Sequence, residues 1–164
     1  MNGVATDPWT AAQVSKRADL TGPQIIEEWV TYGPFVDARA SGMGLALGRL
    51  LFDAVNHEHD LRFALQVPGA RDSDALWVGI HFVSANINPR LAGHGLAPLA
   101  VVVDGGYLTP VADVELHGNV FDIVRSACAR RSVNQIRGMR WKGDASKHYD
   151  KLFPFTPPEE DIPE

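Results

Sequence analysis

Cysteine is almost missing from this chain, with Cys128 as the single example among 164 residues. One cysteine excludes an internal disulfide, so the fold must rest on its hydrophobic core. Long apolar runs are missing too: "LAPLAVVV" and "GMGLALGRLLF" fall far short of the ~20 residues of a membrane-spanning helix. The start, "MNGVATDPWTAAQ", lacks the basic residues and apolar stretch of a secretory signal. We therefore expect a cytoplasmic protein.

Apolar residues make up 45% of the chain and charged residues 21%, values typical of globular proteins. At this length one domain buries most of the surface that its unfolded chain exposes. We expect a single domain over residues 1–164, with extended or flexible ends at 1–7 and about 153–164. The net charge of −5 weighs against nucleic acid as the default partner.

Helical spacing of apolar residues and capping signals predict helices in the first third of the chain. The expected ranges are 8–18, Thr21 to Gly33, and Ser41 to about Asn56. A last helix is expected over 119–137, with Asn119 as its cap.

Between these helices the apolar pattern alternates with period two, which predicts strands at 61–67, 75–83, 99–104 and 107–116. The sequence "DGG" between the last two is typical of a tight hairpin, and 84–98 is expected to be a long loop. The predicted class is α+β. An antiparallel sheet of about four strands is expected to pack against the long helix and the C-terminal helix. A pair of helices is expected at the N-terminus.

Acidic and imidazole side chains gather in "DVELHG" (113–118), which forms the end of the last expected strand. In a strand, Asp113, Glu115 and His117 project from one face, while the alternate positions are apolar and face the core. A histidine beside a carboxylate can transfer protons near neutral pH. The pattern predicts a catalytic group of these three residues or, on the other interpretation, only the solvated face of an antiparallel sheet.

Three further histidines precede this stretch. His81 lies on the more polar face of the strand expected at 75–83, and His57 and His59 stand two apart in "HEHD". Neighbouring strands would bring imidazoles and carboxylates together, and such a mixed set can bind a divalent metal ion that activates water. We therefore expect His81 in the catalytic group and His57 and His59 as metal ligands, with a spacing that matches no tight metal motif.

A small molecule is the partner that we expect, in a pocket between the polar sheet face and the loop at 84–98. Arg90 in that loop can hold an anion, and His94, flanked by glycines, can move over the pocket. Trp77, beside His81, adds an aromatic ligand-binding surface. The leading hypothesis is a small-molecule enzyme or a ligand-binding domain with a His/carboxylate pocket on the sheet face.

The segment "AAQVSKRADLTGPQI" resembles the helix–turn–helix of small MerR- or excisionase-type DNA-binding proteins. The positions that match are Val14, Leu20, Thr21 and Ile25. The resemblance implies a nucleic-acid-binding regulator, in which the basic run at 125–142 would contact the phosphate backbone. Against this, the second helix carries Glu27 and Glu28 and no basic residue between 21 and 33, and carboxylates repel phosphates. On the other interpretation of the basic run, its arginines cover the solvent face of a helix, and some of them pair with the acidic tail or with a partner subunit.

A third hypothesis is a non-catalytic subunit of a larger complex. The sequence ends in "YDKLFPFTPPEEDIPE", which combines aromatic residues, prolines and acids and is typical of an extended docking segment. A homo-oligomer and a hetero-oligomer are both compatible with it. The substrate, the reaction and the presence of a metal stay open at this point.

Overall fold

The protein is described by a computed structural model that covers residues 7–40, 42–152 and 154–164, with only the backbone at residue 45. The expected flexible end at 1–6 and the start of the expected long helix at Ser41 lie outside these residues. The chain forms two compact units, residues 1–44 and 45–164. Among the helices described, none combines the length and the hydropathy needed to cross a membrane.

The N-terminal unit consists of two helices, α1 (Asp7–Ser15) and α2 (Gly22–Ala40). Thr21 directly precedes α2, but the expected side-chain cap is not formed. Its hydroxyl and its amide both donate to Oε1 of Gln24, at 2.8 Å each, whereas a cap accepts from a helix amide. The prediction that this helix ends near Gly33 was wrong: α2 continues through Pro34 to Ala40. No described side chain of either helix is buried.

The C-terminal unit begins with two long helices, α3 (Leu45–Ala64) and α4 (Asp74–Gly93). The strands predicted at 61–67 and 75–83 are therefore helical, and most of the predicted loop at 84–98 belongs to α4. The reason is visible in which side chains of α4 are buried. They recur every three or four residues: Leu76, Ile80, Val83, Ile87 and Leu91.

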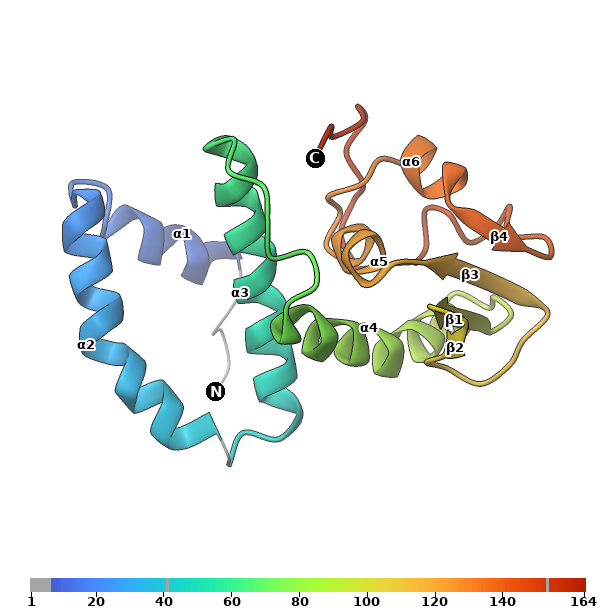
Figure 1. The fold of residues 1–164 in the computed structure, drawn as a ribbon, viewed down its shortest axis with the longest axis horizontal. Helices are drawn as coiled ribbons and strands as arrows, with labels where there is room; N and C mark the ends of the chain where they lie inside the picture. Colours follow the sequence, from blue (N-terminus) through green and yellow to red (C-terminus); the bar gives the residue numbers. More distant parts are fainter. Residues whose placement is uncertain (1–6, 41, 153) are drawn as a thin grey trace. The chain divides into compact units, whose positions relative to one another are not determined.

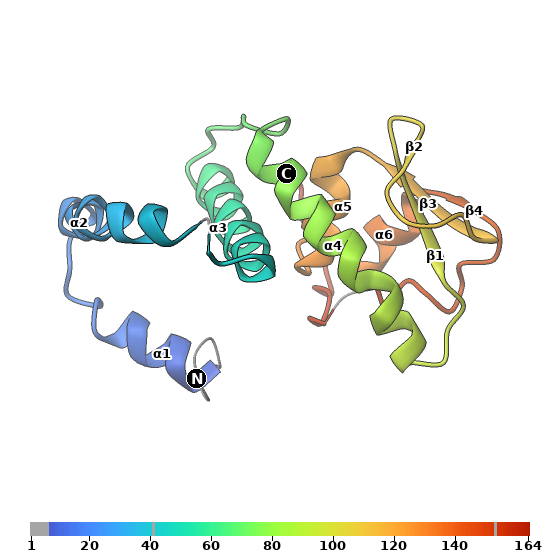
Figure 2. The ribbon, with the colours of Figure 1, turned by 90° about the horizontal axis from the view of Figure 1, so that it is seen from below.

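Glycines let the helices of this unit approach one another closely. A Cβ built on Gly48 of α3 would lie 3.6 Å from Phe82 of α4. Gly79 of α4 faces Val124 in the same way, at 3.7 Å. Helices α3 and α4 lie side by side in both ribbon views (Figures 1 and 2), and together with the next helix they form one side of the core.

The sheet has four strands in the order β2-β1-β3-β4 (Figure 1). They are β1 (Leu99–Val103), β2 (Gly106–Tyr107), β3 (Val114–Gly118) and β4 (Arg140–Lys142). The prediction of a purely antiparallel sheet was wrong, because β1 and β3 run parallel while β2 and β4 are antiparallel to their neighbours. The sheet is therefore mixed, within an α+β fold.

The hairpin predicted from "DGG" is confirmed between β1 and β2. Asp104 and Gly105 have φ angles of 49° and 80°, as a tight two-residue turn of this type requires. The strand predicted at 107–116 breaks in two, because the Thr109 hydroxyl turns inward. It donates to the carbonyl oxygen of Leu99 and accepts from the amide of Val101, at 2.9 and 2.8 Å.

After β3 come α5 (Val120–Ala127) and the short α6 (Val133–Gly138). The Asn119 cap is confirmed, since its side chain accepts from the amide of Asp122 at 2.8 Å. The prediction of one helix over 119–137 was wrong: α5 ends at Ala127, and α6 begins at Val133 after a break. One face of the sheet, with Leu99, Val101 and Leu116, packs with α4 and α5 into the core.

Candidate functional site

Glu115 and His117 lie together on β3, on the sheet face that is turned away from the core. Glu115 Oε2 is 2.7 Å from His117 Nε2. Two other strands add one partner each. The Tyr107 hydroxyl of β2 and the Lys142 ammonium of β4 donate to Glu115 Oε1, at 3.2 and 2.6 Å. Lys142 reaches it because the two residues are paired across β3 and β4. These four residues form the sheet-face cluster.

Glu115 is held as an anion at the centre of this cluster. Its side chain is only 3% exposed. The hydrogen bond from Lys142, aided by those from His117 and Tyr107, lowers the pKa of Glu115 against the opposing effect of burial. Both carboxylate oxygens are already engaged, so the group is well suited to hold three strands together. The described residues of the C-terminal unit form cavities beside α3, α4 and the C-terminal segment, and the sheet-face cluster does not line these.

The other residues expected in the catalytic pocket are not brought to Glu115. Asp113 is exposed and lies before β3 begins. Trp77 and His81 are one turn apart on α4, where both are exposed, rather than on a strand. His94 is exposed just beyond the end of the same helix. Helix α4 packs against the core side of the sheet, so its solvent side cannot extend the sheet-face cluster.

His57 and His59 lie on α3, where two residues are separated by about 200° around the helix axis. His57 is exposed, with Nδ1 3.4 Å from an oxygen of Asp60. His59 is buried, and its ring meets that of Phe121 edge to face at 4.8 Å. Within the described parts of the chain, no three His, Cys, Asp or Glu side chains are grouped to hold a metal ion. The two histidines thus do not form a shared metal site, and metal binding stays a prediction.

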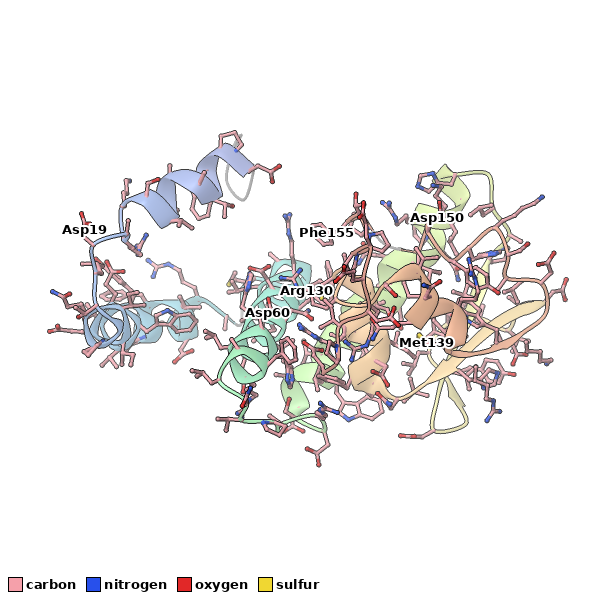
Figure 3. All side chains as sticks on the ribbon, turned by 90° about the horizontal axis from the view of Figure 1, so that it is seen from above. Asp19, Asp60, Arg130, Met139, Asp150 and Phe155 are labelled. Carbon is pink, nitrogen blue, oxygen red and sulfur yellow. The ribbon has the colours of Figure 1, made fainter. Side chains whose placement is uncertain are left out.

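Arg90, expected to hold an anion, lines a hollow in a different place from the predicted pocket. This α3–α4 cavity has a volume of about 480 Å³ and lies between α3, α4 and the C-terminal segment. Its walls carry three aromatic rings, Phe52, Phe82 and Phe155; the first two lie 5.4 Å apart, and Phe155 is labelled in Figure 3. The predicted pocket between sheet and loop is replaced by one between two helices.

Two arginines and one acid supply the charge of the α3–α4 cavity: Arg49, Arg90 and Asp53. The Nε of Arg90 donates to the carbonyl oxygen of Lys151 at 3.3 Å, which orients the guanidinium. Its two terminal nitrogens have no hydrogen-bond partner among the described residues. The cavity therefore combines an apolar wall with an excess of positive charge.

A buried arginine cluster confirms the interpretation in which arginines of the basic run pair with the acidic tail, although the sequence did not indicate that Arg125 would be buried. Arg125 of α5 is 1% exposed and donates to Asp60 at 2.7 Å and to the carbonyl oxygen of Asn56 at 2.8 Å. It also pairs with Glu164, whose side chain is 3% exposed. Burial would raise the pKa of Asp60 and Glu164, but hydrogen bonds from the arginines outweigh burial and lower both values.

The neighbouring arginines are engaged in the same way. Arg130 donates to Asp60 at 2.7 Å, and the two side chains lie together in Figure 3. Arg131 donates to Asp122 at 2.9 Å and to Glu164 at 2.8 Å. Four of the six basic residues in the run that suggested phosphate contacts are thus paired with carboxylates of the protein, namely Arg125, Arg130, Arg131 and Lys142. Fewer positive charges are left to bind a nucleic acid.

Cys128 is part of this buried region. Its thiol donates to Oδ1 of Asn56 at 2.7 Å, and burial raises the pKa of Cys128 to about 11. A thiol that stays protonated at neutral pH is a poor nucleophile and a poor metal ligand. Its role is packing.

One sequence signal could have revealed that Arg125 is buried. In the short amphipathic helix "VFDIVRSA", Arg125 follows Ile123 and Val124 and precedes Ala127. These apolar neighbours place it on the buried side of the helix. Its partners Asp60 and Glu164 are 65 and 39 residues away in sequence, so the pairing itself had no local signature. Comparison with known protein families, with curated proteins and with solved structures gave no match to this chain.

Proposed function

We propose that the C-terminal unit is a ligand-binding domain that holds an amphipathic small molecule with an anionic head in the α3–α4 cavity. The main support is an apolar hollow of about 480 Å³ that carries Arg49 and Arg90 against the single acid Asp53. The volume lies within the range of small-molecule sites. The proposal concerns binding; catalysis by Asp113, Glu115, His117 and His81 stays a separate prediction.

The apolar part of the ligand would lie against Phe52, Phe82 and Phe155. Burying apolar surface stabilises a complex by roughly 25 cal/mol per Å², so a medium-length alkyl chain or an aromatic ring provides most of the affinity. Side chains from two helices and the C-terminal segment surround the hollow, so the walls are positioned by the core itself.

The anionic head would pair with Arg90. A guanidinium presents a planar fork of donors that matches a carboxylate, and its Nε is already fixed by Lys151. Arg49 adds a second positive charge on the facing helix. An uncharged molecule of the same length would use only the apolar wall.

Isothermal titration calorimetry with decanoate and with decan-1-ol tests this directly. We expect decanoate to bind and decan-1-ol to bind at least about tenfold more weakly, since a charge-assisted hydrogen bond contributes roughly 1.5–3 kcal/mol. Arg90→Gln should remove the preference for decanoate. Arg140→Gln, an exposed arginine on β4, is the matched control and should leave it unchanged.

Equal binding of the acid and the alcohol would contradict the charge argument. Decanoate binding that survives in Arg90→Gln and is weakened in Arg140→Gln would place the ligand elsewhere on the protein. The first result would remove the anionic head from the proposal, and the second would remove the α3–α4 cavity as the site.

A further inference from the structure

A second hollow in the C-terminal unit lies beside His59, and the proposed function does not use it. Its volume is about 650 Å³, and its walls come from the end of α3, the loop that follows, the start of α5 and the C-terminal segment. The polar and aromatic side chains of this His59 cavity are His59, Arg62, Phe63, Gln66, Arg71, Phe121 and Glu164.

His59 brings an unpaired polar atom to this cavity. The residue is 4% exposed, and its Nε2 has no hydrogen-bond partner among the described residues. The ring is held by Phe121, at 4.8 Å and an interplanar angle of 74°. Buried polar side-chain atoms almost always have a partner. Since His59 lines the hollow, a molecule bound there can supply the missing one.

The remaining charges leave the cavity with an excess of positive charge. Glu164 is already neutralised by Arg125 and Arg131, and Arg62 is paired with Glu58 at 2.8 Å. Arg71 is different. Its guanidinium lies 4.6 Å above the centre of the Phe121 ring and has no carboxylate partner within the described residues.

We propose that the His59 cavity binds a small oxyanion, a carboxylate or a phosphate, between Arg71 and the Nε2 of His59. Both side chains line this one cavity and contact the ring of Phe121, which is also part of its wall, so one compact ligand can reach both. The guanidinium of Arg71 pairs with the negative charge. The imidazole completes the site through a hydrogen bond that the protein itself does not satisfy.

The protonation of His59 links this site to pH. Burial and the charge of Arg125 lower the pKa of His59, so its imidazole is neutral at neutral pH. The charged groups around it are Glu58 and Arg62 on α3, Arg125 on α5, and Glu164 in the C-terminal segment. A bound anion favours the imidazolium, so the affinity for the anion should increase as the pH falls.

The test is a titration of the full chain, labelled at histidine, with succinate and separately with inorganic phosphate. The His59 resonance should shift with at least one of the two anions, and the pKa read from that resonance should rise in the complex. Arg71→Gln should weaken binding by about tenfold or more, because a charged hydrogen bond is lost. Arg71 is exposed, so this change should leave the fold intact.

Two further variants separate this site from the α3–α4 cavity and from a merely structural role. Arg49→Gln should leave succinate and phosphate binding unchanged, whereas His59→Phe should abolish it while keeping the ring that packs on Phe121. A shift with succinate alone identifies an organic acid as the ligand class, and a shift with phosphate alone identifies a phosphate. No His59 shift at about 10 mM of either anion, or binding that Arg71→Gln leaves intact, would overturn the proposal whatever the result with decanoate.

Discussion

The two units of this protein contain similar apolar residues and use them in opposite ways. In α2, Trp29, Val30 and Phe35 are 71%, 72% and 60% exposed, and no described side chain of α1 or α2 is buried. In the C-terminal unit, Leu76 and Ile80 of α4 are fully buried. Apolar content alone does not make a core. A helix buries its apolar face only where other elements are placed to receive it.

The charged residues differ between the two units in the same sense. In the N-terminal unit, Arg17 and Glu28 form an ion pair at 2.6 Å in which both side chains are more than a third exposed. In the C-terminal unit, Arg125 and Glu164 meet with 1% and 3% exposure. Exposed pairs contribute little to stability, while removing one partner of a buried pair leaves a charge without compensation. We therefore expect residues 45–164 to determine the stability of the fold.

The largest effect should come from shortening a core side chain. Leu76→Ala is expected to lower the free energy of unfolding by about 3–5 kcal/mol, because the side chain is fully buried on α4. Ile26→Ala, at a position 64% exposed on α2, should change it by about 0.5 kcal/mol or less. Urea denaturation followed by circular dichroism measures both. A comparable loss in Ile26→Ala would show that α2 is covered in solution, and the contrast between the units would fail.

Glu164→Gln is expected to lower the free energy of unfolding by a smaller amount. Arg125 and Arg131 each lose one charged partner but keep another, Asp60 and Asp122 respectively. We expect a destabilisation of about 1–3 kcal/mol, the range for a charged group that is left partly unsatisfied. Glu28→Gln is the matched control in the N-terminal unit and should cost about 0.5 kcal/mol or less. Equal losses in the same denaturation experiment would mean that burial does not distinguish the two ion pairs.

Local signals in the sequence predicted local structure well. The Asp104–Gly105 hairpin and the Asn119 cap depend on residues within four positions of one another, and both are confirmed. The strand predicted at 75–83 was wrong because a nine-residue window cannot separate a buried strand from a buried helix. Ile87 and Leu91 continue the helical spacing beyond that window. The helix was not predicted there because Pro89 suggested a loop.

For the candidate sites, the sequence predicted only the contacts between residues of one strand. Glu115 and His117 share a face, as expected from their spacing, but their catalytic role stays a prediction. Lys142 could not be anticipated, because three residues of β4 give no detectable alternation. The α3–α4 cavity could not be predicted either, since it requires α3 and α4 to be helices along their whole lengths.

The smallest expected effect is a pH dependence that only one unit can show, because every histidine of the sequence lies after residue 44. Burial and Arg125 lower the pKa of His59 below 6.5, its value in the unfolded chain. The unfolded state therefore binds the proton first as the pH falls, so stability is complete above pH 6.5 and declines below it.

Between about pH 7.5 and about pH 5.5 the carboxylates of the arginine cluster stay ionised while histidines titrate, so the difference between the unaltered protein and His59→Phe isolates the contribution of His59. The free energy of unfolding should therefore fall over this window in the unaltered protein and fall less in His59→Phe. His57→Gln, an exposed histidine on the same helix, should keep the unaltered dependence. If both variants keep the pH dependence of the unaltered protein, the loss of stability at low pH does not come from His59. The buried imidazole would then not account for a difference between the two units.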